Sequence, residues 1–279
     1  MKVRIITAVV ALAILLPILI FSDTILFPLA MAVLSFVGAL EMLRAWGYLH
    51  HFAVSIPALG LSAALPLLVY FLPFARRYEL MLIFLAAYAA LMCYWFTYAV
   101  LRGGKEKFSD LSACYVALSY ITAGFCSLGL LRSAPAGVYL FLIPMIGAWL
   151  TDTFAYFSGM LFGRHKLCPT LSPKKTVEGA IGGTVGGVAS VVVFGVIVGA
   201  VTEFRANILS LILCGLAVSV LSQIGVLIAS LIKRERGIKD YGRVFPGHGG
   251  VLDRFDSVIA TSIVTYVICL LPASAAVLA

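Results

Sequence analysis

Long apolar runs, separated by short polar connections, make up most of this chain of 279 residues. A helix needs roughly 20 consecutive apolar residues to cross the hydrocarbon core of a bilayer. Most of the runs approach or exceed that length, so the pattern predicts an all-α, polytopic integral membrane protein with about nine transmembrane helices. The predicted spans are residues 5–21, 25–40, 52–74, 80–100, 111–131, 137–157, 177–201, 208–232 and 251–271.

The composition agrees with this pattern and excludes a soluble globular domain. Hydrophobic residues form 62% of the chain and charged residues only 11%, whereas about a quarter of the residues in a soluble domain are charged. The net charge of +8 is compatible with either nucleic acid or anionic lipid as a partner. Because the basic residues flank apolar spans, their distribution favours the lipid bilayer and argues against nucleic acid.

The basic residues also predict the orientation of the spans. If the N-terminus is cytoplasmic, the cytoplasmic segments and the adjoining helix ends hold all but four of the 20 Lys and Arg residues. Such an excess is typical of cytoplasmic loops, and nine spans then place the C-terminus outside. We therefore expect a multi-pass protein of the cell membrane. The four exceptions are Arg76, Arg77, Arg132 and Arg205.

The two longest connections, residues 158–176 and 233–250, are both predicted on the cytoplasmic side. No loop is long enough for a separate soluble domain. We therefore expect an N-terminal membrane region, residues 1–132 with spans one to five, and a catalytic membrane region, residues 133–279 with spans six to nine. The active site is expected at the cytoplasmic ends of the last four spans.

Residues 230–256, between and at the ends of the last two spans, combine several cations with a glycine-rich turn and closely spaced carboxylates. Charged groups at a membrane boundary are costly unless they bind something charged. The segment therefore suits a metal-bound polyphosphate better than a solvated loop. Its candidate contact residues are Lys233, Arg234, Lys239, Asp240, His248, Gly249, Gly250, Asp253, Arg254 and Asp256.

Asp253 and Asp256 are three residues apart where the last span begins. On a helix this spacing puts both carboxylates on one side, so they can share a divalent cation. Mg²⁺ prefers a few carboxylate oxygens together with substrate phosphates. The alternative is that the pair only offsets the helix dipole, but the nearby Asp240, His248 and Arg254 favour the metal site.

Asp152 lies inside the sixth predicted span, about a turn and a half from its cytoplasmic end. An ionisable residue at such a depth is a candidate functional residue. Tyr156 is four residues further on and would share its helix face. The alternative is a structural ion pair between Asp152 and a basic residue of a neighbouring helix.

The string Ser172-Pro173-Lys174-Lys175-Thr176 precedes the seventh span. Pro173 suits the first position of a helix and Ser172 suits the N-cap. Lysines in a first turn oppose the helix dipole, which is understandable if an anion binds there to Lys174, Lys175 and the free backbone N–H groups. The alternative is general anchoring of basic residues on the cytoplasmic side.

Glycines recur every fourth residue in the seventh span, at Gly179, Gly183 and Gly187. This spacing predicts a small-residue face for close helix packing, a structural role. The six cysteines are scattered and show no CxxC spacing, so we interpret them as small packing residues.

Four other polar residues are less clear. His248 between glycines is compatible with a phosphate contact, a metal ligand or the cap of a turn, and His165 is a weaker candidate for such roles. Glu41 and Arg44, at the end of the second span, stay unassigned. The sequence has neither a serine in a nucleophile elbow nor a P-loop lysine motif, which argues against Ser/His/Asp catalysis and a Walker-type site.

These residues together resemble the signature of the phosphatidate cytidylyltransferase family, also called CDP-diacylglycerol synthases. The likeness is close over the C-terminal half and only general in the N-terminal half. The signature reads Ser230-x-x-Lys233-Arg234-x4-Lys239-Asp240-x5-Pro246-x-His248-Gly249-Gly250-x-x-Asp253-Arg254-x-Asp256. Upstream blocks similar to the family are Asp152-Thr153-x-Ala155-Tyr156, Gly163-x-His165-Lys166 and Ser172-Pro173-Lys174-Lys175-Thr176-x-Glu178-Gly179.

The resemblance implies that phosphatidic acid and CTP react to CDP-diacylglycerol and pyrophosphate, with Mg²⁺ required. The acidic cluster exceeds what one Mg²⁺ needs, so a second cation is compatible with it. The resemblance also implies a homodimer. The implied catalytic residues are Asp253, Asp256, Asp240, Asp152, Lys239 and Arg254, and the four aspartates are also the implied metal ligands. The implied substrate-binding residues are Lys174, Lys175, Ser172, Tyr156, His248, Gly249, Gly250, Lys233 and Arg234.

Two other functions compete with this interpretation. A CTP-dependent polyprenol or phytol kinase resembles the same superfamily but transfers the γ-phosphoryl group to a hydroxyl. A secondary transporter for an anionic metabolite would show matched broken helices in two halves, whereas the charges here gather in the C-terminal half. A purely structural scaffold leaves Asp152, Asp253 and Asp256 unexplained.

Overall fold

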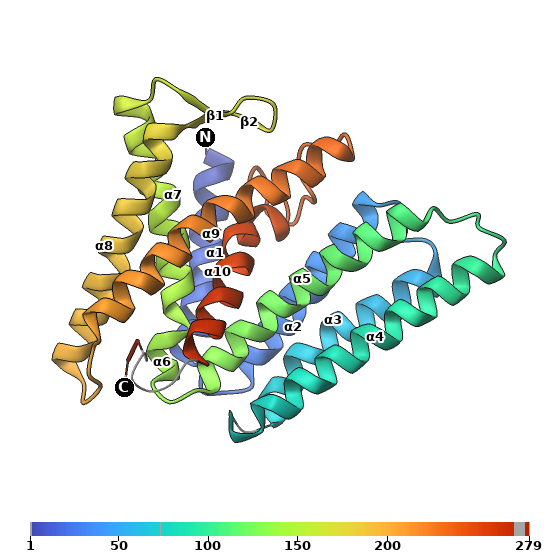
Figure 1. Ribbon diagram of the computed structural model, residues 1–279, viewed down its shortest axis with the longest axis horizontal. Coiled ribbons are helices and arrows are strands. Elements are labelled where there is room, and N and C mark those ends of the chain that lie inside the picture. Colours follow the sequence, from blue (N-terminus) through green and yellow to red (C-terminus); the bar gives the residue numbers. More distant parts are fainter. Residues whose placement is uncertain (1, 73, 271–276, 279) are drawn as a thin grey trace. The chain divides into compact units, whose positions relative to one another are not determined.

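The computed structural model describes residues 2–72, 74–270, 277 and 278. It is mostly helical, with one two-stranded hairpin (Figure 1). In chain order the elements are α1 (Lys2–Ile20), α2 (Leu26–Ala45), α3 (Phe52–Phe71), η1 (Phe74–Arg76), α4 (Arg77–Leu101), α5 (Phe108–Ser133), α6 (Gly137–Leu140), α7 (Leu142–Phe162), β1 (Lys166–Cys168), β2 (Ser172–Thr176), α8 (Val177–Val201), α9 (Ile208–Glu235) and α10 (Leu252–Cys269).

Among the described residues, seven helical segments are long and apolar enough to cross a membrane. They comprise α2 to α5, the consecutive α6 and α7, α8 and α9, so the chain is a multi-pass membrane protein. Helices α1 and α10 occupy the first and last predicted spans, although Leu271, the predicted end of the last span, lies outside the described residues. The count of nine spans and the orientation of the termini stay predictions.

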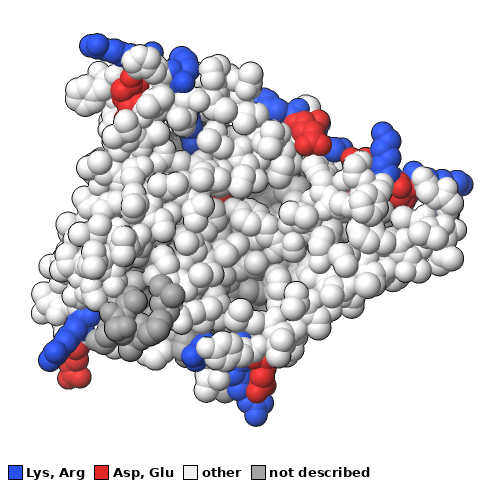
Figure 2. Space-filling model, in the orientation of Figure 1, with Lys and Arg blue, Asp and Glu red and all other residues white. Residues whose placement is uncertain are grey.

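The sixth predicted span is two helices, α6 and α7, which meet at Phe141. Pro144 follows one turn after the last residue of α6 and has no N–H to donate to the Leu140 carbonyl, so the regular helical pattern is interrupted there. Figure 2 shows charged side chains mainly near helix ends, while the helix flanks between them carry few charges. This is the distribution that a bilayer core requires.

The chain divides into two compact units, which are described separately. The first unit comprises Met1–Leu130 and Arg236–Arg254. In it α2 packs on α3, and α3 on α4. A buried chain of hydroxyls joins three helices: Tyr88 of α4 donates to Thr122 of α5 at 2.7 Å, and Thr122 donates to Ser62 of α3 at 3.1 Å. These bonds satisfy polar groups that would otherwise be unpaired in an apolar core.

The second unit comprises Leu131–Glu235 and Phe255–Ala279, with α7, α8 and α9 packed against one another. The glycine face of α8 lies on α7. A Cβ atom on Gly179 would lie 2.8 Å from the Ala155 carbonyl oxygen, and one on Gly183 would lie 2.9 Å from that of Thr151. Both distances are shorter than van der Waals contact, so the predicted packing role of these glycines is confirmed.

Candidate active site

The hairpin β1–β2 corrects the sequence-based prediction for residues 172–176. Ser172 and Thr176 pair with Cys168 and Lys166 in an antiparallel ladder, and α8 begins only at Val177. Ser172 is therefore a strand residue, and its predicted role as the N-cap is wrong. The residue before a proline is biased toward extended conformations, which suits Ser172 to the strand, and the hairpin bonds its backbone.

Thr176 is the actual N-cap of α8. Its backbone is extended (φ −123°, ψ 156°), and its hydroxyl oxygen accepts a hydrogen bond from the Gly179 N–H at 3.1 Å. This arrangement satisfies one of the otherwise unpaired N–H groups of the first turn. Lys174 and Lys175 consequently project from a strand, so their predicted place in the first turn of a helix is also wrong, whereas their predicted contact with an anion stays a prediction.

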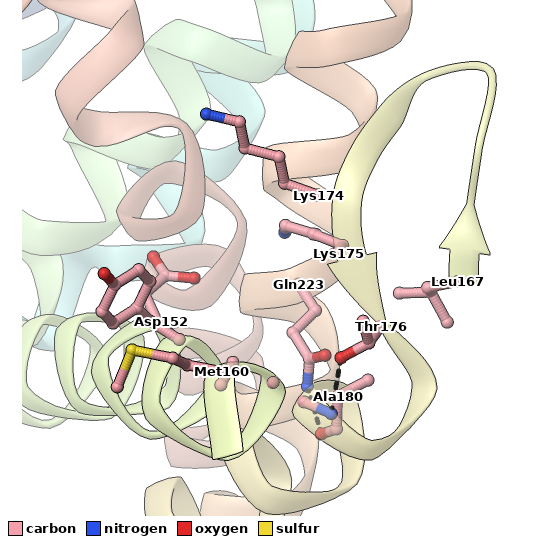
Figure 3. Close-up of a pocket in the computed structure, with 12 residues that line it drawn as sticks. Asp152, Met160, Leu167, Lys174, Lys175, Thr176, Ala180 and Gln223 are labelled. Atoms are coloured by element: carbon pink, nitrogen blue, oxygen red, sulfur yellow. Dashed lines mark hydrogen bonds between the residues drawn. The ribbon is translucent and has the colours of Figure 1, made fainter. Parts of the chain in front are cut away.

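A pocket of about 280 Å³ lies between the hairpin and helices α7, α8 and α9, wholly within the second unit (Figure 3). This volume is near the lower end of the range for ligand pockets, about 300–1,000 Å³. The polar side chains that line it come from three elements: Asp152 and Tyr156 (α7), Lys174, Lys175 and Thr176 (β2) and Gln223 (α9). Gly179 and Ala180 of α8 also line it. Two of the predicted blocks, the one from Asp152 to Tyr156 and the one from Ser172 to Gly179, thus converge on one cavity.

Lys175 and Asp152 bring opposite charges into this pocket. Both lysine side chains of β2 extend to the side on which Asp152 lies (Figure 3). Lys174 is exposed and Lys175 half-buried. Burial lowers the pKa of Lys175 from its ordinary value, while the charges of Asp152 and Asp256 oppose that shift. An incoming phosphate would add negative charge and favour the ammonium form further.

Asp256, in the first turns of α10, belongs to the same electrostatic group. Its charge interacts with those of Asp152, Lys175 and Lys233, and its Oδ1 accepts the Ser257 N–H at 2.8 Å. The Ser257 side chain in turn hydrogen-bonds to Asp152. The second unit therefore assembles two carboxylates and two ammonium groups from four elements.

Asp253 belongs to the first unit and has a structural role there. Its Oδ2 accepts hydrogen bonds from the N–H groups of Tyr241 and Gly250, at 2.8 and 2.9 Å. These bonds tie the start of α10 to the preceding loop. The sequence-based interpretation of Asp253 as a metal ligand did not include this role, and it stays a prediction.

The glycine-rich turn before α10 has a regular geometry. The His248 N–H donates to the Phe245 carbonyl at 2.8 Å, and Gly247 has φ +78°. Proline at the second position and a glycine with positive φ at the third are typical of a type II turn, which explains Pro246-Gly247. Gly249 also has a positive φ, +91°. The backbone of His248 thus closes a turn, whereas its predicted contact with phosphate or metal is untested.

No three His, Cys, Asp or Glu side chains lie close enough to hold a metal ion by themselves in the part of the chain that the structure describes. Asp152 and Asp256 lie in the second unit, and Asp240 and Asp253 in the first. A single centre with all four ligands stays a prediction. Of the other predicted cations, Lys239, Arg234 and Arg254 are exposed, and Lys233 is half-buried.

Sequence reasoning missed Gln223, a pocket residue on α9. Its amide nitrogen donates to the Thr184 hydroxyl at 3.0 Å and to the carbonyls of Ala180 and Ser219 at 3.2 and 3.3 Å. Because carbonyls only accept, these partners fix the orientation of the amide. A lone amide in an otherwise apolar span was the available signal.

Glu178 and His165, both in the predicted upstream blocks, form a contact of their own. The Glu178 carboxylate accepts the Arg164 N–H at 3.0 Å, and His165 Nδ1 lies 2.6 Å from Glu178 Oε1. These bonds hold the chain between α7 and β1 against the first turn of α8. They therefore support the hairpin that carries Lys174 and Lys175.

Comparison with known proteins agrees with the geometry. A model of the cytidylyltransferase family matches residues 2–271. A phosphatidate cytidylyltransferase of Staphylococcus haemolyticus (strain JCSC1435) is 37% identical over 261 residues, covering 92% of this chain and 94% of the relative. That of Staphylococcus aureus (strain COL) is 37% identical over 257 residues, with the same coverage. This chain therefore belongs to the cytidylyltransferase family and is a nucleotidyltransferase.

Proposed function

We propose that this enzyme transfers the cytidylyl group of CTP to phosphatidate, so that CDP-diacylglycerol and pyrophosphate are formed. The observation that carries the proposal is the extent of the similarity: relatives named phosphatidate cytidylyltransferase match 92% of the chain at 37% identity. The pocket supports it independently, because two lysines and a membrane-embedded carboxylate converge there.

The chemistry explains why the chain needs no protein nucleophile. The phosphate of phosphatidate is anionic at neutral pH and can attack the α-phosphorus of CTP itself, and the bond from that phosphorus to pyrophosphate then breaks. Like charges oppose the approach, so catalysis consists mainly of positioning and charge neutralisation. Lys175 would neutralise phosphate charge inside the pocket and Lys174 at its rim, with Lys239 and Arg254 as further cations.

The carboxylates of the second unit fit a magnesium ion. Asp152 and Asp256 lie near enough for their negative charges to interact, and such a pair is stabilised by a cation between or beside it. Mg²⁺ accepts one or two carboxylates together with substrate phosphates, so the absence of a three-residue cluster among the described residues is compatible with it. When bound, the ion would stabilise charge on the phosphates and on departing pyrophosphate. Asp253 and Asp240 are proposed as additional ligands, and a second cation is compatible with four carboxylates.

The site is proposed to face the cytoplasm, in the cell membrane. CTP is a cytosolic nucleotide, while the acyl chains of phosphatidate have to stay in the bilayer. A pocket bounded by a hairpin and by membrane-spanning helices serves both needs, since the lipid headgroup can enter from the side. A homodimer is proposed on the family resemblance.

The decisive experiment is pyrophosphate release by the purified protein with phosphatidate, CTP and Mg²⁺, each omitted in turn. Release only with all three supports the proposal, and release without phosphatidate contradicts it. CTP labelled in the α or γ position separates this reaction from a lipid kinase. Retention of α-label in the lipid identifies the cytidylyltransferase, whereas γ-label identifies the kinase. Metal-independent exchange of an anion across liposomes, without pyrophosphate release, would instead support a transporter.

A further inference from the structure

Glu41 is a buried acid in α2 that the proposed reaction does not use. Glu41 is only 1% exposed, and it lies in a helix that is apolar enough to cross a membrane. Burying a carboxylate without partners is very costly. The partners of Glu41 therefore indicate what the acid does.

Both carboxylate oxygens accept hydrogen bonds from the backbone at the start of α10. The Val251 N–H donates to Oε1 and the Leu252 N–H donates to Oε2, each at 2.9 Å. The first N–H groups of a helix have no partner within the helix. Glu41 supplies that partner from 210 residues away in sequence, in place of a local N-cap side chain. Its negative charge also complements the positive end of the helix dipole.

The loop backbone closes around this carboxylate. A Cβ atom on either Gly242 or Gly250 would overlap Glu41 Oε1. Both positions therefore require glycine so that the backbone can approach the acid. This requirement gives Gly250 of the signature a physical reason that does not involve substrate.

Glu41 and Asp253 hold the same short stretch of backbone from two sides. Asp253 accepts the Gly250 N–H, and Glu41 accepts the next two N–H groups, those of Val251 and Leu252. Three consecutive N–H groups thus bind two carboxylates, one local and one from α2. All of these residues belong to the first unit.

We propose that Glu41 is a positioning residue: it fixes the glycine-rich turn and the start of α10, and thereby the orientation of Asp253. In this arrangement α2 does more than anchor the chain in the membrane, since it holds the backbone of residues 251 and 252 in place. The contact with the backbone is independent of the reaction. The effect on turnover through Asp253 rests on the proposed function.

The test compares Glu41→Gln with a matched control, Ser35→Ala. Both residues are buried in α2, but the Ser35 hydroxyl has no hydrogen-bond partner among the described residues. The glutamine amide keeps the size of the side chain, but presents an NH₂ donor to one of the two N–H groups. We expect kcat to fall roughly ten- to a hundredfold, as for other residues that orient ligands. Backbone hydrogen exchange of a peptide covering residues 241–254 should become faster, with peptides of α3 to α5 unchanged. Ser35→Ala should alter neither quantity.

A double-mutant comparison with Asp253→Asn separates positioning from general destabilisation. If Glu41 acts through Asp253, Glu41→Gln should cost clearly less activity in the Asp253→Asn background than in the native enzyme. Equal losses in both backgrounds, or unchanged exchange of residues 241–254, would overturn the proposal. If Asp253→Asn alone is fully active, the metal role of Asp253 fails. The exchange and kcat of Glu41→Gln then still decide whether Glu41 orders the turn.

Discussion

Lys175 of β2 and Asp152 of α7 line the same pocket, and their opposite charges interact there. The negative charge of Asp152 raises the pKa of Lys175, but burial has the larger effect and lowers it. Two effects therefore oppose each other in the protonation of Lys175: burial favours the neutral amine, and the nearby carboxylates favour the ammonium. A substrate phosphate would shift this balance toward the charged form.

Lys175 should control the alkaline limb of the pH profile. A lysine is protonated below its pKa and neutral above it, so kcat/KM should fall as pH rises through the lowered pKa of Lys175 in the free enzyme. Lys175→Arg keeps the positive charge at high pH, and the limb should move to higher pH in that variant. An alkaline limb at the same pH in both enzymes would contradict a charge role for Lys175.

Lys174 is expected to contribute mainly to substrate binding, because it is exposed at the rim of the pocket. Lys174→Ala should raise KM more than it lowers kcat, since an exposed cation contacts ground state and transition state alike. Steady-state kinetics with CTP and phosphatidate varied in turn would measure both. Unchanged KM and kcat would remove the proposed phosphate contact.

Asp256→Asn and Asp253→Asn should strongly lower turnover while the protein still inserts into the membrane. The amide keeps the shape of each side chain but loses the negative charge that binds a cation, and we expect a loss of roughly a hundredfold or more. Pyrophosphate release measures turnover, and membrane fractionation with size-exclusion chromatography measures insertion and folding. Near-normal activity in either variant would remove that residue from the metal site.

Thr176→Val should destabilise the start of α8 by about 1 kcal/mol, the usual value of an N-cap side chain. Valine keeps the β-branched shape suited to the strand but cannot accept the Gly179 N–H. The matched control is Ser190→Ala on the same helix, whose hydroxyl only donates back to the Gly186 carbonyl. Thermal unfolding in detergent would compare the two, and equal midpoints would contradict the cap.

Gly187→Ala should destabilise the packing of α7, α8 and α9. The added Cβ would overlap the hydroxyl oxygens of Thr151 and Ser219, and such overpacking typically costs about 1–3 kcal/mol. Gly60→Ala is the control, because a Cβ there has nothing within 4 Å. The first variant should unfold at a lower temperature, whereas the second should be neutral or slightly stabilised by the better helix propensity of alanine. The reverse order would refute the packing role.

Local patterns in the sequence were enough to predict most of the helices and to select candidate residues that the structure brings to one pocket. Runs such as residues 177–201 and 208–232 coincide closely with α8 and α9, because span length and hydropathy follow from the bilayer alone. The glycine spacing in α8 likewise predicted a packing face. Asp152, Tyr156, Lys174 and Lys175 were chosen as candidates, and all four line one pocket.

Local patterns failed where two nearby residues were both suitable as the N-cap of a helix, and where a side chain binds residues far away in the sequence. Ser172 and Thr176 are both good N-cap residues, and only the pairing of β2 with β1 decides that the helix starts after Thr176. Gln223 has neighbours on α8 that no periodicity reveals.

The amino-acid sequence by itself determined the membrane-spanning class, the spans that the long apolar helices occupy and the family to which the enzyme belongs, because these depend on composition, spacing and a contiguous signature. The tertiary structure alone decided that Glu41 accepts hydrogen bonds from the N–H groups of Val251 and Leu252. It also decided that the charge of Lys175 interacts with those of Asp152 and Asp256. Hydrogen bonds and charge interactions between distant segments leave no periodic trace in a chain, since they depend on which backbone groups the fold leaves unpaired.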